Sequence, residues 1–203
     1  MTIMQSRCSS ADIGIPEDAD DDFLLARMME DDESAFRLLV ERHVDRAYAL
    51  ALRILGNSAD AEDVAQEALV KTWTHRHNWK FGKARFSTWL YRVVVNRCID
   101  LRRLPRNEWI ENVDEPADER IDAVGFIQKR EVFARLEDAL ETIPVQQRVA
   151  LTLAYFDDLG NAEIAEILGT TVAAVESLLK RGRQGLRTRL RRSERDIQGA
   201  LEL

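Results

Sequence analysis

The sequence is poor in the residues that break helices and in those that cross-link small folds. Its 203 residues include only 9 glycines and 4 prolines, which favours helices over turn-rich sheets. The two cysteines, Cys8 and Cys98, are too few and too dissimilar in context to indicate a disulfide framework. No apolar run approaches the roughly 18 residues of a membrane span, and the N-terminus lacks the layout of a signal peptide. We therefore expect an all-α protein in the cytoplasm.

The net charge of −7 is distributed unevenly along the chain. Residues 1–70 carry −10, residues 71–106 carry +9, residues 107–170 carry −10 and residues 171–203 carry +4. Each basic block could neutralise a phosphate backbone, while the acidic remainder resists non-specific attachment to nucleic acid. A basic run is usually just a solvated surface, so these blocks indicate nucleic-acid binding only together with other features.

Apolar periodicity divides the chain into two helical units. Residues 1–22 are acidic and lack periodicity, which predicts a mobile tail. Residues 23–106 contain helical patterns and form the first unit, and residues 126–203 form the second. Between them, residues 107–125 are acidic and have no sustained apolar face, as is typical of a linker. The expected architecture is two small helical domains joined by an acidic linker.

Turn and cap residues set the expected helix ends in the first unit. Gly56 is placed to end one helix in a left-handed conformation, and Ser58 or Asp60 to cap the next. Ser87 is a candidate N-cap for a third helix, which stops at Pro105.

Residues 60–103 change from an acidic helical face to a basic segment with interleaved aromatics. Three-and-four spacing places an acidic and polar face on one side of the first helix. This face fits a protein partner, although a solvated surface would have the same pattern. The residues expected to face the core from this helix are Ala61, Val64, Ala65, Ala68 and Leu69.

The aromatic residues of this stretch fall into two groups. Trp73, Trp89 and Tyr91 lie within the apolar periodicity and are expected in the core. The positions of the remaining three are left open between the core and base stacking: Trp79, Phe81 and Phe86.

Residues 161–190 have the layout of a helix-turn-helix. A short helix with Ile164, Ala165 and Leu168 inward ends at Gly169, and the second helix turns Val172, Val175 and Leu179 inward. DNA binding is the favoured interpretation, and a purely structural helix pair is the alternative. The candidate DNA-binding residues are Thr171, Ala173, Ala174, Glu176, Ser177, Lys180, Arg181 and Arg183.

Three ordered blocks resemble the extracytoplasmic-function sigma factors of bacterial RNA polymerase. They are ALRILGNSADAEDVAQEALVKTW, RFSTWLYRVVVNRCIDLRR and IPVQQRVALTLAYFDDLGNAEIAEILGTTVAAVESLLKRGRQGLR. The resemblance implies a region 2 domain for core polymerase and the −10 element, and a region 4 domain for the −35 element. It also implies control by an anti-sigma factor, possibly membrane-bound.

The resemblance assigns roles to individual positions. The face implied to dock on the clamp helices of the largest polymerase subunit consists of Glu62, Asp63, Gln66, Glu67 and Val70, and region 4 is implied to meet the polymerase flap. The residues implied to bind the −10 element are Asn78, Lys80, Phe81, Lys83, Arg85, Arg92, Asn96, Arg97, Asp100, Arg102 and Arg103.

One segment departs from the family pattern. A Gly-Thr-Val-Lys-Ser-Arg run usually opens the recognition helix, whereas this chain has AAVESL at residues 173–178. Two basic contacts are missing, so the family's −35 sequence cannot be assumed for this chain.

Other classes of function explain less of the sequence. A helix-turn-helix repressor or activator would account for residues 161–190, but it leaves the acidic face and the basic aromatic segment unexplained. An enzyme is disfavoured because no Gly-rich phosphate loop follows a strand and no motif places a nucleophile beside a base. His75, His77 and Cys98 form only a weak metal pattern, and we expect no metal and no cofactor. A structural helical adaptor remains a minor alternative.

Overall fold

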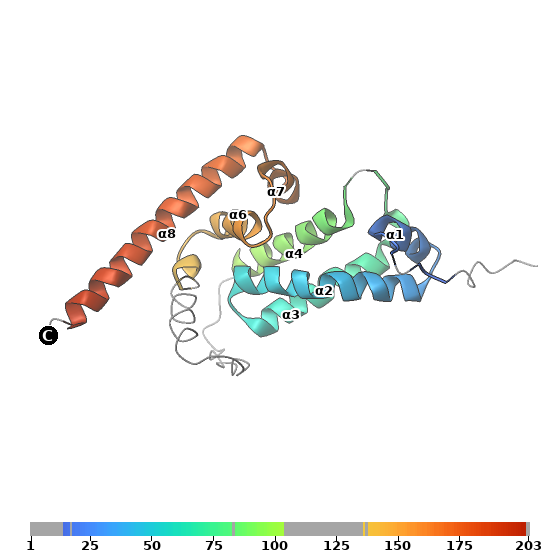
Figure 1. Ribbon diagram of the computed structural model, residues 1–203, viewed down its shortest axis with the longest axis horizontal. Coiled ribbons are helices and arrows are strands. Elements are labelled where there is room, and N and C mark those ends of the chain that lie inside the picture. Colours follow the sequence, from blue (N-terminus) through green and yellow to red (C-terminus); the bar gives the residue numbers. More distant parts are fainter. Residues whose placement is uncertain (1–13, 17, 83, 104–135, 137, 202–203) are drawn as a thin grey trace, which may run out of the picture.

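The computed structural model describes residues 14–16, 18–82, 84–103, 136 and 138–201, with side chains as far as Arg191, and every regular element in this part of the chain is helical (Figure 1). The predicted all-α fold is therefore confirmed. No helix among these residues is long and apolar enough to cross a membrane. The helices are α1 (Asp21–Met29), α2 (Glu33–Leu55), α3 (Ser58–Thr74), the 3-10 helix η2 (Arg76–Asn78), α4 (Phe86–Arg103), α6 (Val145–Tyr155), α7 (Asn161–Leu168) and α8 (Val172–Leu201).

Helices α1 to α4 form the first unit, with α2 packed against α1, α3 and α4. Apolar residues at three-and-four spacing give each helix one buried side. The five residues of α3 predicted to face the core are all buried, which confirms the sidedness of that helix. Helix α1 begins at Asp21, inside the segment expected to be a tail. Asp20 caps it by accepting a 2.8 Å hydrogen bond from the Phe23 N–H.

The structure confirms one predicted helix end and corrects two others. Gly56 ends α2 in the left-handed region at φ 71°, as the sequence predicts. The N-cap of α3 is Asn57, not Ser58 or Asp60: the Asn57 Oδ1 atom accepts a 2.8 Å hydrogen bond from the Asp60 N–H. Helix α4 starts at Phe86 and not after Ser87. The buried Phe86 ring packs edge-on against His43 and stacks on the ring of Trp89, so the first residue of this helix belongs to the core.

Helices α6 to α8 form the second unit, which packs against the first. Helix α6 contacts α2 and α4, and α7 contacts α4 (Figure 1). The buried residues of both units form one hydrophobic cluster. The acidic linker expected at residues 107–125 lies outside the described residues.

The joint between the units is centred on the Ile54 carbonyl in the last turn of α2. The last carbonyls of a helix have no partner within the helix and form the negative end of its dipole. The Ile54 oxygen accepts a 2.8 Å hydrogen bond from Arg148 Nη1 of α6, and 3.3 Å bonds from Nε and Nη2 of Arg102 of α4. Arg148 is only 2% exposed, so its guanidinium depends on protein partners.

We expect Arg148→Ala to lower the free energy of unfolding by about 2 kcal/mol, because hydrogen bonds from charged donors contribute roughly that much and a void is left. Urea denaturation followed by circular dichroism measures the change. Arg37→Ala, at an exposed position of α2, is the control and should change it by less than about 0.5 kcal/mol. Equal effects of the two substitutions would contradict the role given to Arg148.

Candidate functional site

The outer side of α3 presents polar groups around an exposed apolar residue. Glu62, Asp63 and Gln66 are exposed, and Glu67 is half-buried. Val70 is 58% exposed one turn further along. The structure thus brings the five residues of the predicted docking face onto one surface. An apolar centre beside ionised groups is suited to a protein partner that supplies basic side chains around an apolar contact.

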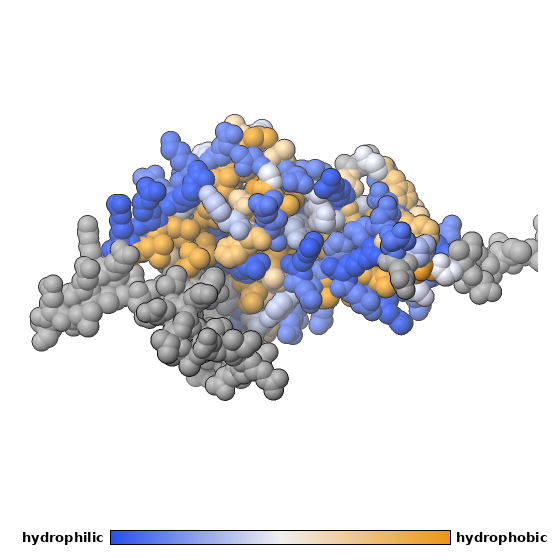
Figure 2. All heavy atoms as spheres, viewed as in Figure 1, coloured by the Kyte–Doolittle hydropathy of each residue, from blue (hydrophilic) through white to orange (hydrophobic). Residues whose placement is uncertain are grey.

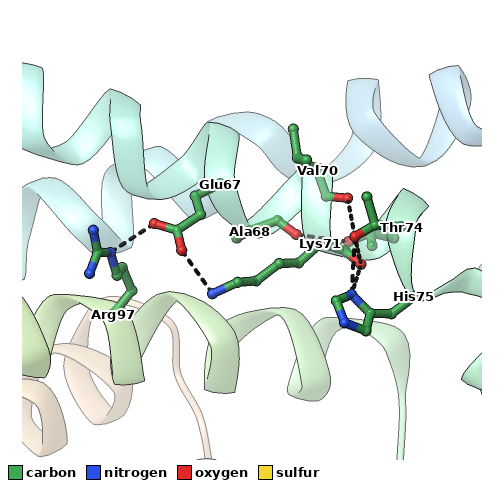
Figure 3. A network of polar contacts seen from close by, with 8 residues as sticks. Glu67, Ala68, Val70, Lys71, Thr74, His75 and Arg97 are labelled. Atoms are coloured by element: carbon green, nitrogen blue, oxygen red, sulfur yellow. Dashed lines mark hydrogen bonds and ion pairs between the residues drawn. The ribbon is translucent and has the colours of Figure 1, made fainter.

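Glu67 links this face to α4 (Figure 3). Its Oε1 atom lies 2.8 Å from Lys71 Nζ, and its Oε2 atom lies 2.7 Å from Arg97 Nε. The hydrogen bond from Lys71 lowers the pKa of Glu67, and the charge of Arg97 lowers it further, against the opposing effect of burial. Glu67 is therefore ionised at neutral pH and couples the predicted docking face to a predicted DNA-binding residue.

Helix α4 presents four of its predicted DNA-binding residues on one exposed side. Arg92, Asn96, Asp100 and Arg103 are all exposed, at spacings of four, four and three. The other two predicted residues of this helix are turned toward protein. Arg97 pairs with Glu67, and the half-buried Arg102 donates to the Ile54 carbonyl.

The loop between η2 and α4 carries exposed groups that could meet a nucleic-acid strand. Asn78, Lys80 and Arg85 are exposed, and Phe81 is 48% exposed. Gly82 has a φ of 77°, which permits the turn at the tip of the loop. Lys83 lies outside the described residues.

The aromatic residues near this loop separate into core and surface. Phe86 is fully buried, and Trp79 and Trp89 are half-buried against it with ring centroids 6.0 and 6.2 Å from that of Phe86. Tyr91 is also buried, and Trp73 is half-buried against the core. The expectation that Trp73, Trp89 and Tyr91 belong to the core is confirmed. Of the three open cases, Phe86 is a core residue and Phe81 is a surface residue.

A pocket lies beside the aromatic cluster at the base of the loop. The Trp79 Nε1 atom has no hydrogen-bond partner among the described residues. Flat aromatic walls suit a planar heterocycle. Sequence periodicity could not locate this pocket, because one of its walls comes from α1. Its lining residues are Met28, Thr72, His75, Arg76, Asn78, Trp79 and Trp89.

Helices α7 and α8 have the geometry of a helix-turn-helix. Gly169 ends α7 in the left-handed region at φ 63°, and Thr171 Oγ1 accepts a 3.2 Å hydrogen bond from the Ala174 N–H at the start of α8. Val175 and Leu179 are buried, as predicted. Val172 was expected inward but is 43% exposed, because it opens α8 at the turn, past the end of α7.

The inward side of α7 differs by one residue from the expectation. Ile164 and Ala165 are buried, but Ile167 is buried in place of Leu168, which is only half-buried. On α8, Ala174 is half-buried, and the remaining predicted DNA-binding residues are all exposed: Thr171, Ala173, Glu176, Ser177, Lys180, Arg181 and Arg183.

Helix α8 can approach α6 closely because of Gly182. A Cβ atom at this position would lie 2.9 Å from Leu151 Cδ1 of α6, closer than packed carbon atoms tolerate. Gly185 gives a similar close approach, since a Cβ atom there would lie 3.1 Å from Ile143 Cγ2.

Polar contacts also connect α4 to the second unit. The Tyr91 hydroxyl donates a 3.3 Å hydrogen bond to Asp157 Oδ1 in the turn after α6. Arg85 lies 4.0 Å from Glu163 of α7, and the Arg92 guanidinium lies beside Gly169. Burial raises the pKa of Tyr91 to about 12, and burial also raises the pKa of Asp157 above its usual value.

Within the described part of the chain, no group of three or more His, Cys, Asp or Glu side chains could hold a metal ion. His75 Nδ1 lies 3.1 Å from the Lys71 carbonyl oxygen, and His77 Nε2 lies 3.6 Å from Asp31 Oδ1. Cys98 is buried in the core, and this burial raises the pKa of its thiol to about 12.

Comparison with known proteins identifies two family regions in the chain. Residues 39–108 match the family model of sigma-70 region 2, and residues 133–186 match that of sigma-70 region 4. The chain is 30% identical over 178 residues to the ECF RNA polymerase sigma factor SigW of Bacillus subtilis, with 82% of this chain and 95% of SigW covered. It is 34% identical over 154 residues to the ECF RNA polymerase sigma factor SigE of Mycolicibacterium smegmatis, covering 73% and 59% of the two chains.

Two solved structures share the fold of this chain. CnrH, solved in complex with the cytosolic domain of CnrY, is 28% identical and superposes with a TM-score of 0.63, covering 84% of this chain and 97% of CnrH. The sigma factor RpoE of Bartonella quintana, solved with the anti-sigma factor NepR, shares the fold with a TM-score of 0.60 at 19% identity, covering 77% and 96% of the two chains.

The raised pKa of Asp157 predicts a pH-dependent stability. The folded protein binds this proton more tightly than the unfolded chain, so Asp157 lowers stability as the pH rises from about 4 through the raised pKa. Asp157→Asn keeps an acceptor for Tyr91 and removes this effect. We expect the variant to gain stability over the unaltered chain at pH 7, and the gain to shrink toward pH 4, in urea titrations at both values.

The control for this experiment is Asp158→Asn, because Asp158 is the exposed neighbour in the same turn. It should not reproduce the gain of Asp157→Asn at pH 7, because exposed substitutions usually change the unfolding free energy by less than about 0.5 kcal/mol. A gain from Asp157→Asn that does not depend on pH would show that burial of the carboxylate is not the cause.

Proposed function

Because the chain belongs to the extracytoplasmic-function (ECF) RNA polymerase sigma factors, we propose that it is a dissociable specificity subunit that binds core polymerase and directs it to promoters. The observation that carries the proposal is the pairing of the exposed face of α3 with the basic face of α4, joined through Glu67 and Arg97. A helix-turn-helix repressor or activator would need α7 and α8 only. The proposed site of action is the cytoplasm, where polymerase and DNA meet.

The proposed polymerase contact is the outer side of α3. Asp63 and Gln66 supply polar groups, and Val70 supplies an exposed apolar contact. Glu67 acts from the edge of this surface, since Lys71 and Arg97 already neutralise much of its charge. In the assembled enzyme the clamp helices of the largest subunit would cover this side, and the flap would meet the second unit.

The proposed −10 contact consists of α4 and the loop before it. Opening a duplex without ATP requires favourable sites for an unstacked base and for the separated strand. The pocket lined by Trp79 and Asn78 would hold the base. The exposed face with Arg92, Asn96 and Arg103 would hold the strand.

The proposed −35 contact is the exposed face at the start of α8. Thr171, Ala173 and Ser177 are exposed at the end that a helix-turn-helix places at base edges. Because the chain lacks two of the family's basic residues here, phosphate anchoring must come from elsewhere on the helix. When both DNA contacts are held on one polymerase, binding of one raises the effective concentration of the other at its site. Neither contact therefore needs high affinity for DNA alone.

We further propose control by an anti-sigma factor. The similarity to CnrH, solved with the cytosolic domain of CnrY, and the shared fold with RpoE, solved with NepR, support this proposal. Such a partner would cover surfaces that polymerase or promoter DNA needs. Its anchoring in a membrane would follow the pattern implied by the family resemblance.

The test of the proposed function is transcription with purified core polymerase on a library of promoter fragments. We expect promoter-specific transcripts that depend on the added chain. The variants Asn96→Ala and Arg103→Ala should reduce permanganate reactivity of the −10 region about tenfold while core binding stays within about twofold, because both side chains are exposed. A repressor or an adaptor would give no transcripts with any core enzyme.

The contact with polymerase can be tested separately by the double variant Asp63→Arg and Val70→Asp. We expect at least tenfold weaker binding to core polymerase, equivalent to about 1.4 kcal/mol, with little change in the unfolding free energy. Asp63 is preferable to Glu67 for this purpose, because reversing Glu67 would also release Arg97 of α4. Glu41→Arg, an exposed charge reversal on α2, is the control. Unchanged affinity of the double variant in fluorescence titrations would exclude this surface.

A further inference from the structure

Helix α8 carries more positive charge than the proposed −35 contact uses. Between Glu176 and Glu194 the sequence contains seven basic residues and no acidic one. As far as Arg191, none of these basic side chains forms an ion pair within the described part of the chain. Arg181 donates to the Ser177 carbonyl and Arg183 to the Tyr155 hydroxyl, and neither acceptor carries a charge.

These charges lie along one side of the helix. At 3.6 residues per turn, Lys180, Arg183, Arg187 and Arg191 fall within an arc of about 80°. We call these four residues the basic stripe. All four are exposed, and they line a shallow groove together with Gln184 and Thr188. Figure 2 shows hydrophilic residues along the outer edge of α8, while the buried Val175 and Leu179 lie on the side toward the body.

The basic stripe continues the surface that the helix-turn-helix presents to DNA. Ala173 and Ser177 point to the same side of α8 as Lys180 and Arg191. At 1.5 Å per residue, Arg187 and Arg191 lie about 15 and 21 Å beyond Ser177 along the helix axis. The major groove is about 12 Å wide, so residues at this distance from a base-contacting turn lie beyond the groove edge, at the level of the phosphates.

We propose that the basic stripe binds the phosphate backbone of duplex DNA beside the −35 element, as an anchoring contact without base specificity. The proposal rests on the function proposed above and adds Arg187 and Arg191 to the DNA contacts. Arginine suits this role because its guanidinium donates two parallel hydrogen bonds to phosphate oxygens. The stripe also supplies, further along the helix, the phosphate anchoring that the AAVESL segment lacks.

The test measures how salt affects binding of the full chain to a labelled 30-bp duplex of random sequence. Each phosphate contact contributes about −0.9 to the slope of log affinity against log salt concentration. The double variant Arg187→Gln and Arg191→Gln should therefore have a slope less negative by about 1.8. Glutamine keeps the helix propensity, so circular dichroism should be unchanged.

The matched control removes the same amount of charge away from the stripe. The control variant combines Arg189→Gln and Arg37→Gln. Arg189 lies on the opposite side of α8 from Arg187 and Arg191, and Arg37 lies on an exposed part of α2. This double variant should have the slope of the unaltered chain. Equal slopes for the stripe variant and the control, or no binding of the unaltered chain at 50 mM salt, would overturn the proposal.

Assays of the same variants with core polymerase distinguish a failure of the stripe proposal from a failure of the proposed sigma function. If transcription persists and the stripe variant leaves the slope unchanged, only the stripe proposal fails. If the stripe variant loses affinity for core polymerase with an unchanged DNA slope, an acidic protein surface is the partner and the proposal is wrong. If no transcription occurs with the unaltered chain, the sigma function fails, and the salt slope still decides whether the stripe contacts DNA.

Discussion

One backbone carbonyl, that of Ile54 at the end of α2, binds side chains from both helical units. Arg102 of α4 and Arg148 of α6 both donate to it. The acceptor lies at the negative end of a helix dipole, where a cation is stabilised. Arg148 is almost fully buried, and leaving its guanidinium without partners would cost several kcal/mol. These hydrogen bonds add to the shared hydrophobic core in holding the second unit against the end of α2, and α7 packs against α4.

Local periodicity predicted the sides of the helices correctly in most places. The buried alanines of α3 and the exposed Asp63 and Val70 follow from three-and-four spacing, because a helix in contact with one core has one apolar side. The left-handed Gly56 was also predictable, since few other residues adopt that conformation. The cap at Asn57 was not predictable, because several neighbouring side chains can accept the same N–H and the backbone conformation selects one.

Contacts between segments distant in the sequence were beyond prediction. The roles of Arg97 and Arg102 illustrate the difference, because both belong to a basic block that suggests DNA binding. The first pairs with Glu67 of α3, and the second binds the end of α2. The charge of +9 in residues 71–106 therefore overstates the charge available to a phosphate backbone. Without Arg97 and Arg102, the exposed polar surface of α4 is narrower than the basic block suggests. It contains Asn96 between Arg92 and Arg103.

Glycine in the middle of a long helix normally weakens it, by about 1 kcal/mol relative to alanine. Gly182 occupies such a position in α8, where a Cβ atom would lie 2.9 Å from Leu151 Cδ1 of α6. The lack of a side chain at Gly182 thus allows α8 to pack closely against α6. A methyl group there would press on the Leu151 side chain, so that side chain or α8 would have to shift. A shift of α8 would change the direction of its exposed face and leave the chemistry of that face intact, so a residue on the buried side of the helix controls how the exposed side is presented.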